Sequence, residues 1–142
     1  MCGVDGMKSR DTLIRLKRFQ VDEKRRRVAQ IEMMIAEFDR MSTDLDREIA
    51  VEEQKAGISD PSHFAYPTYA KAARQRRGNL RRSADDLKTQ LEDAKAELGE
   101  AFEELKKAEV LEDRERSAER AFGNARDPAA VSESSRSART GL

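Results

Sequence analysis

Apolar residues recur along the first half of the chain at alternating intervals of three and four residues. This spacing places a narrow apolar stripe on one side of an α-helix, which is typical of helices that pack against a partner helix. The stripe runs through residues 14–56, although Lys17, Lys24, Ser42 and Glu52 interrupt it. Its strongest positions are Val21, Val28, Ile31, Ile35, Phe38, Leu45 and Ile49.

A second stripe of the same period covers residues 80–108 without interruption. It alternates large and small side chains, because Leu80, Leu87, Leu91, Leu98 and Leu105 share it with alanines at 84, 94, 101 and 108. Four heptads of this kind favour a coiled-coil helix over disorder.

Glycine and proline divide the chain between the two stripes. Residues 8–56 contain neither, whereas Gly57, Pro61 and Pro67 follow within a short stretch. Since proline lacks the amide proton that a helix interior uses, this stretch reads as a connector. We therefore expect one helical arm over residues 8–56, a connector over 57–67 and a second arm over 68–120. The two ends, residues 1–7 and 121–142, are expected to be disordered.

The two arms are expected to pair with each other. They have similar lengths, and a chain that folds back near Ser62 brings Leu45 opposite Leu80 and Ile35 opposite Leu91. The sequence therefore predicts an all-α fold, a long antiparallel two-helix coiled-coil hairpin with a disordered C-terminal tail. A shift by one heptad would preserve the stripes, so the pattern leaves the register open.

Charge supports the antiparallel arrangement. Residues 8–27 carry a net charge of +6 and residues 28–56 one of −5, whereas residues 68–82 carry +6 and residues 83–113 carry −7. Folding back places each basic block beside an acidic one, while a parallel dimer of either arm would oppose like charges. Charges that flank a seam set orientation in this way.

Composition excludes several classes of protein. Of the 142 residues, 39% are charged and 5% aromatic, which leaves too little apolar material for the layered core of an ordinary enzyme. No stretch approaches the roughly 18 apolar residues that span a bilayer. Residues 1–6 lack the regions of a signal peptide, and Cys2 is the single cysteine. We expect a cytoplasmic protein.

The residues that usually carry chemistry are sparse. His63 is the single histidine and falls in the connector, and Cys2 has no histidine near it in sequence. The carboxylates lie on helix faces without a pocket to shift their pKa. The sequence therefore predicts a protein that is not an enzyme, with no catalytic residue, no metal site and no cofactor.

Two basic clusters, residues 24–27 and 74–82, raise the question of nucleic acid. Neither has interleaved aromatic residues for base stacking, and the 28 basic residues are balanced by 28 acidic ones. We interpret both clusters as solvated faces that select the topology, and expect no nucleic-acid partner. An RNA-binding hairpin is the alternative, with an affinity that falls steeply with salt.

Six bulky apolar residues lie outside the stripes and fall at the end of the hairpin opposite the connector. A pair of helices cannot bury such positions by itself, so these residues, called the tip residues below, are candidates for contact with a partner. Single exposed apolar side chains are nevertheless normal, and Met33, Met34 and Met41 provide others in the middle of the first arm. The tip residues are Leu13, Leu16, Phe19, Phe102, Val110 and Leu111.

Residues 7–32, MKSRDTLIRLKRFQVDEKRRRVAQIE, resemble the opening of flagellar export proteins of the FliJ family. The shared features are a short basic start, a Leu-Ile-Arg-Leu-Lys-Arg segment and a long charged helix. The resemblance continues through the connector and the second arm to about Glu119.

The resemblance implies a stalk-like coiled-coil component of the flagellar type III export apparatus, at the cytoplasmic face of the basal body. Its implied partners are the hexameric export ATPase, the export-gate membrane protein and export chaperones. By analogy, the end carrying both termini would enter the ATPase ring. No individual binding residue is carried over. The alternative is a cytosolic coiled-coil adaptor with chaperone-like properties, which would bind helical partners through Met33 and Met41.

Overall fold

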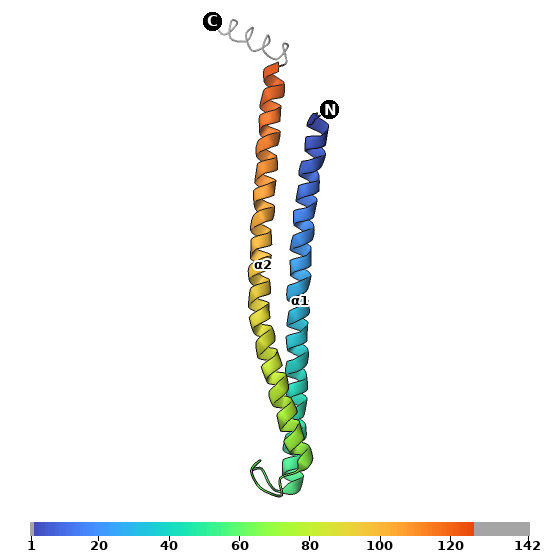
Figure 1. The fold of residues 1–142 in the computed structure, drawn as a ribbon, viewed down its shortest axis with the longest axis vertical. Coiled ribbons are helices and arrows are strands. Elements are labelled where there is room, and N and C mark those ends of the chain that lie inside the picture. The colour runs from blue at the N-terminus through green and yellow to red at the C-terminus, as the bar shows by residue number, and fades with distance from the viewer. Residues whose placement is uncertain (1, 127–142) are drawn as a thin grey trace, which may run out of the picture. The chain divides into compact units, whose positions relative to one another are not determined.

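The computed structural model describes the backbone of residues 2–126 and the side chains of residues 9–123. It contains two helices, α1 from Cys2 to Ala56 and α2 from Thr68 to Arg126, joined by residues 57–67 (Figure 1). The helices pack closely against each other in an antiparallel sense. The predicted all-α hairpin is thus confirmed, and the connector has the predicted bounds.

The outer ends of both helices extend beyond the predicted arms. α1 begins at Cys2 rather than at residue 8, and α2 continues to Arg126 rather than ending at residue 120. The expected disorder of residues 2–7 and 121–126 was therefore wrong. Extending an existing helix adds one hydrogen bond for each residue fixed, so isolated glycines, at about 1 kcal/mol each, do not stop it. The rest of the expected tail, residues 127–142, and residue 1 lie outside the described residues.

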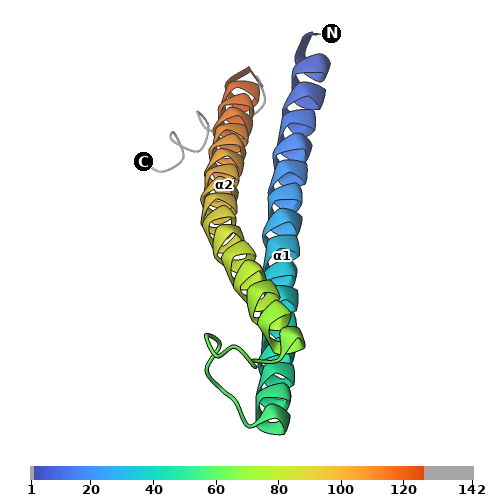
Figure 2. The same ribbon diagram turned by 60° about the horizontal axis from the view of Figure 1, so that its bottom comes forward.

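The connector forms a loop between the ends of α1 and α2 (Figure 2), and hydrogen bonds within it fix its turns. Gly57 ends α1 with a positive φ of 69°, a conformation that suits glycine because it lacks a Cβ. Asp60 then closes a turn by accepting hydrogen bonds from the amide and the hydroxyl of Ser62, at 3.0 and 2.7 Å. These bonds lower the pKa of Asp60. The carbonyl oxygen of Pro67 accepts from the amide of Lys71 at 3.0 Å, which starts α2.

The chain forms two compact units, each built from both helices. Within the described residues, unit 1 combines residues 2–21 with 101–126, and unit 2 comprises Asp22–Glu100. In both units the apolar stripes face the other helix. Of the predicted seam residues, Val21, Ile31, Leu45, Ile49 and Leu87 are buried, and Val28, Ile35, Phe38, Leu80, Leu91, Leu98 and Leu105 are half-buried.

Unit 2 holds the main apolar core. One cluster centres on Ile31, Leu87 and Ala94, with Val28, Ile35, Phe38 and Leu91 packed against it. A second joins Leu45 and Ile49 of α1 to Ala73 of α2, with Leu80 beside them. Since Ile35 shares a cluster with Leu91 and Leu45 shares one with Leu80, the structure adopts the register with the fold-back near Ser62.

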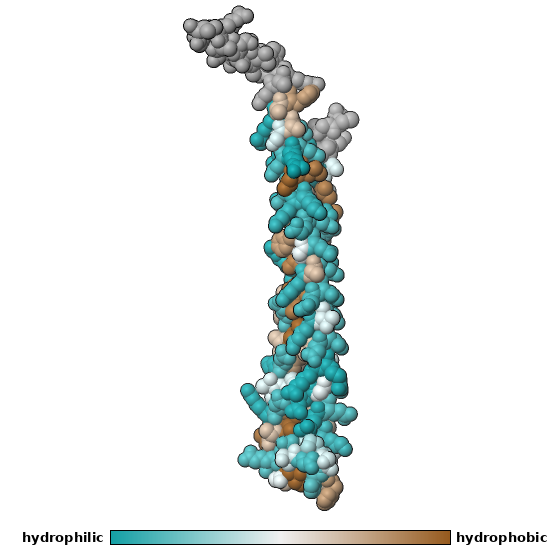
Figure 3. Space-filling model, turned by 90° about the vertical axis from the view of Figure 1, so that its left-hand side faces the viewer, coloured by the Kyte–Doolittle hydropathy of each residue, from teal (hydrophilic) through white to brown (hydrophobic). Residues whose placement is uncertain are grey.

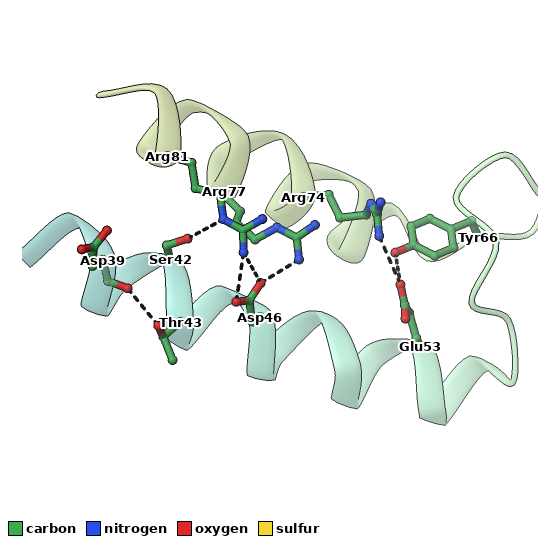
Figure 4. Close-up of polar contacts among 9 residues, drawn as sticks. All are labelled: Asp39, Ser42, Thr43, Asp46, Glu53, Tyr66, Arg74, Arg77 and Arg81. Carbon is green, nitrogen blue, oxygen red and sulfur yellow. Dashed lines mark hydrogen bonds and ion pairs between the residues drawn. The ribbon is translucent and has the colours of Figure 1, made fainter. Parts of the chain in front are cut away.

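Tyr66 closes the connector end of unit 2. Its ring is buried, and its hydroxyl donates to Glu53 Oε1 at 2.6 Å, while the guanidinium of Arg74 lies 3.7 Å from the same oxygen (Figure 4). Burial, followed by the hydrogen bond to Glu53, raises the pKa of Tyr66. The phenol thus links the connector to the last turns of α1.

Removing the central core side chain should destabilise unit 2. We expect Ile31→Ala to lower the free energy of unfolding by about 2–4 kcal/mol, because Ile31 is only 2% exposed and its loss leaves a cavity. The neighbouring Met33→Ala is the control, since Met33 is 73% exposed, and should change it by less than about 0.5 kcal/mol. Urea unfolding followed by circular dichroism measures both. Equal effects would contradict the described packing.

Tyr66 should make stability depend on alkaline pH. Folding raises the pKa of Tyr66 above the ordinary 10.0, so the stability that the protonated phenol adds is present below pH 10. This stability is lost as the pH rises through the pKa of the folded state. Tyr66→Phe should cost about 1 kcal/mol at pH 7, and this difference from the parent protein should shrink above pH 10. Tyr69→Phe is the comparison, since the Tyr69 hydroxyl donates a similar bond to Glu48 at 2.8 Å but the ring is exposed, and it should show a smaller difference at pH 7. A difference that stayed constant with pH would argue against the Glu53 hydrogen bond.

Candidate interaction surface

Three charged residues of α1 in unit 1, Arg10, Lys17 and Arg18, lie near carboxylates of α2. Arg10 donates to Glu115 at 2.6 Å and to Glu119 at 2.7 Å, and the hydrogen bond to Glu119 contributes most to raising the pKa of Arg10. Lys17, at a seam position, donates to Glu104 at 2.8 Å and lowers the pKa of that carboxyl group. Cross-helix ion pairs therefore occupy seam positions that an ordinary coiled coil fills with apolar side chains.

Unit 2 contains ion pairs of the same kind. Lys24 donates a hydrogen bond to Glu97 at 3.0 Å. The carboxylate of Asp46 forms ion pairs with Arg77 at 2.7 Å and with Arg81 at 3.2 Å (Figure 4). Buried Ser42 accepts a further hydrogen bond from Arg81 Nε at 3.2 Å. These contacts join basic stretches of one helix to acidic stretches of the other, as the predicted charge matching requires.

The basic clusters are partly engaged in these contacts. Lys24 from the first cluster, and Arg74, Arg77 and Arg81 from the second, pair with carboxylates of the other helix. Their main visible role is therefore to hold the two helices in register.

The tip residues all belong to unit 1. Leu13, Leu16, Phe19, Val110 and Leu111 are exposed, each by between 41 and 53%. Phe102 is half-buried instead, because its heptad position flanks the seam. Brown apolar surface interrupts the predominantly teal surface near this end in Figure 3.

The tip residues do not form one continuous patch. Successive residues of an α-helix are about 100° apart, so Phe19 and Val110 each fall on the side of their own helix opposite the seam. In two packed helices these sides face in opposite directions. The tip therefore presents separate faces, one on α1 and another on α2.

Between residues 9 and 20, one side of α1 carries no charged residue. Ser9, Thr12, Leu13, Leu16, Phe19 and Gln20 fall within an arc of about 120°, roughly opposite Ile14 and Val21. These six residues are called the outer face of α1. The equivalent face of α2 around Val110 carries charges such as Lys106, Asp113 and Arg114.

A polar hollow lies between the two helices in unit 1. It has a volume of about 300 Å³ and is lined by Asp11, Ile14, Arg15, Arg18, Glu112 and Arg116. Arg116 binds Glu112 at 2.5 Å, and Arg18 lies 3.8 Å from Glu109. Arg15 lines the hollow together with the carboxylates of Asp11 and Glu112, so the hollow contains charges of both signs.

Other exposed apolar side chains lie in unit 2 and in the connector. Met33 and Met34 are exposed on α1, whereas Met41 is half-buried. Phe64, which is 97% exposed, stacks on His63 with ring centroids 4.7 Å apart. His63 Nδ1 accepts a hydrogen bond from the amide of Ala65 at 3.0 Å, so this imidazole nitrogen stabilises the turn of the connector.

The described part of the chain shows no cluster of histidine, cysteine or acidic residues arranged to hold a metal ion. Within the same residues, neither helix has a stretch long and apolar enough to cross a membrane. The side chain of Cys2 lies outside the described side chains.

The sequence analysis grouped Leu13, Leu16 and Phe19 among the tip residues but did not include the uncharged residues Ser9, Thr12 and Gln20 that flank them on the same face. The hollow left no sequence signal, because it depends on where Glu112 and Arg116 of α2 meet α1.

Reversing one seam charge should loosen unit 1. Lys17→Glu places two carboxylates together, so we expect amide hydrogen exchange in residues 101–110 to accelerate several-fold. The swap Lys17→Glu with Glu104→Lys should restore the parent rate. Lys106→Glu, whose partner Glu103 lies on the same helix, is the control. Because the pKa of Glu104 is lowered below its ordinary 4.5, the stability that its ion pair with Lys17 adds is present above pH 4.5. This stability is lost as the pH falls through the pKa of the folded state. Failure of the swap to restore protection would contradict the pairing.

Comparisons with known proteins assign no family to this chain. No protein-family model matches it, and neither the curated proteins nor the solved structures contain a match. A functional proposal therefore rests on the surface described above and on the resemblance of residues 7–32.

Proposed function

We propose that the protein is a non-enzymatic component of the flagellar type III protein export apparatus, which binds the export ATPase ring and helps couple it to the export gate. The observation that carries this proposal is the set of large apolar side chains exposed in unit 1. Leu13, Leu16, Phe19, Val110 and Leu111 lie on helices whose other exposed positions are predominantly charged. Although they lie on separate faces, large apolar side chains that a two-helix hairpin leaves in water are candidates for protein contact.

The remaining support is the pattern of residues 7–32, which resembles the opening of FliJ-family proteins. In this proposal the unit 1 end of the hairpin engages the ring at the cytoplasmic face of the basal body. Binding would favour assembly of the hexamer and link its ATP hydrolysis to opening of the gate. Export chaperones and the gate protein are further proposed partners.

The test is the activity of the purified cognate export ATPase with and without the full chain. We expect the protein to increase both ATP hydrolysis and the hexamer fraction at least twofold. Leu16→Asp combined with Phe19→Asp should abolish both effects, because two carboxylates would replace apolar contact residues. Absence of any effect of the parent protein on either quantity would overturn the proposed function.

Val51→Asp is the matched control. Val51 is 48% exposed and Leu16 49%, both on α1, so the two sites tolerate a carboxylate equally. Because Val51 belongs to unit 2, its substitution should leave the stimulation within twofold of the parent value. Equal loss with Val51→Asp would point to general destabilisation of the hairpin.

A cytosolic adaptor that binds helical partners through the middle of α1 is a second candidate. It is favoured by the exposure of Met33, since methionine adapts to varied apolar partners. An adaptor should retain its partners when Leu16 and Phe19 are replaced and lose them with Met33→Asp and Met41→Asp. Pull-down with the full chain and these variants separates the two functions.

A further inference from the structure

The seam of unit 1 is held by charge where that of unit 2 is held by apolar packing. Arg10 and Lys17 lie seven residues apart, so they occupy equivalent seam positions, and both donate hydrogen bonds to glutamates of α2. Among the described side chains, those of unit 1 that are buried are Ile14, Val21 and Ala101. The two apolar clusters of the hairpin both belong to unit 2.

We propose that unit 1 is a fork, in which residues 2–21 of α1 and residues 101–126 of α2 separate reversibly while unit 2 stays paired. Seam ion pairs hold this fork closed. Salt screens exposed charges, so the fork should open as the ionic strength rises. The open fork presents Ile14 and Val21, which the closed form hides. The inference goes beyond the proposed export function and does not rest on it.

The polar hollow shows that water reaches the seam of unit 1. The hollow has a volume of about 300 Å³, and Ile14 is the single apolar residue among those that line it. Water in such a space solvates the charged groups around it, so separating them costs less than separating the same groups in a dry core. Opening therefore has a short way to go in this unit.

The packing of unit 2 argues against separation of the hairpin as a whole. Its ion pairs, such as that of Asp46 with Arg77, flank apolar clusters and do not replace them. Apolar burial is not weakened by screening of charge. The connector also joins the two helices at this end of the chain path, whereas no covalent link joins residues 2–21 to residues 101–126.

One of the helices must bend if unit 1 opens while unit 2 stays paired. Residues 8–56 of α1 contain no glycine or proline, whereas Gly99 lies two residues before Ala101, where the unit 1 segment of α2 begins. A methyl group at Gly99 would meet no other atom within 4 Å, so packing does not require glycine there. Glycine weakens a helix interior relative to alanine. The bend is therefore assigned to Gly99.

The test is the reactivity of buried seam thiols toward a maleimide in the purified full chain. Ile14→Cys and Ile49→Cys are matched substitutions, since both side chains are buried seam residues of α1, at 6 and 3% exposed. Each is combined with Cys2→Ala, which removes the natural thiol. Val51→Cys, at an exposed site, reports how salt changes the reaction itself.

The rates are compared in about 0.01 M and about 1 M NaCl, between which the Debye length falls from about 30 Å to about 3 Å. Relative to position 51, we expect the thiol at 14 to react at least fivefold faster at high salt and the thiol at 49 to change by less than twofold. No rise at 14, or an equal rise at 49, would overturn the fork. A rise that depends on protein concentration would indicate exchange of segments between copies, which would also overturn it.

Replacing the charged seam residue should lock the fork. In Lys17→Leu an apolar side chain takes a position that coiled coils usually fill with one, so the salt effect at position 14 should fall below twofold. A fivefold salt effect that persisted in this variant would rule out the ion pair of Lys17 as the element that holds the fork closed.

The bend has its own matched pair of variants. Gly99→Ala should slow the reaction at position 14 in about 1 M NaCl at least threefold, because alanine stiffens the helix at that point. Gly78→Ala, at another glycine inside α2 that belongs to unit 2, should change this rate by less than twofold. An unchanged rate with Gly99→Ala would overturn the assignment of the bend.

Discussion

Each helix in this fold has a single neighbour, and this constraint governs every other feature. One seam is the only place where apolar side chains can leave water, so residues outside it are polar unless something else covers them. The same constraint makes exposed Phe19 and Leu16 informative, because in a layered globular protein such residues would find a place in the core. A high content of charged residues follows from the architecture itself.

The two units meet this constraint differently. Unit 2 fills its seam with branched and aromatic side chains around Ile31 and Leu45. Unit 1 has fewer apolar seam residues and relies more on ion pairs such as those of Arg10 and Lys17. Such pairs contribute only about 0–1 kcal/mol each when exposed and weaken with salt. Unit 1 is therefore the more easily remodelled part of the hairpin, and it also carries the exposed tip residues.

The repeating features were predictable from the sequence. Heptad spacing identifies the seam, proline and glycine mark the connector, and blocks of charge select the antiparallel direction. The start of α1 at Cys2 and the end of α2 at Arg126 were not predicted, because an existing helix extends through isolated glycines and polar residues that do not favour it. The ion pairs of Asp46 with Arg77 and Arg81, and the hydrogen bond of Tyr66 to Glu53, could not be predicted, because they join residues that are distant in sequence. For the same reason no single-helix pattern could show that Phe102 is partly covered.

The order of the charge blocks has a consequence for synthesis. α1 leaves the ribosome before α2 exists, and at about 5–20 residues per second its apolar seam stays unpaired for several seconds. If two unfinished chains paired in parallel and in register, the +6 block of one chain would meet the +6 block of the other. The charge pattern thus discourages association between growing chains until each has made its own second helix.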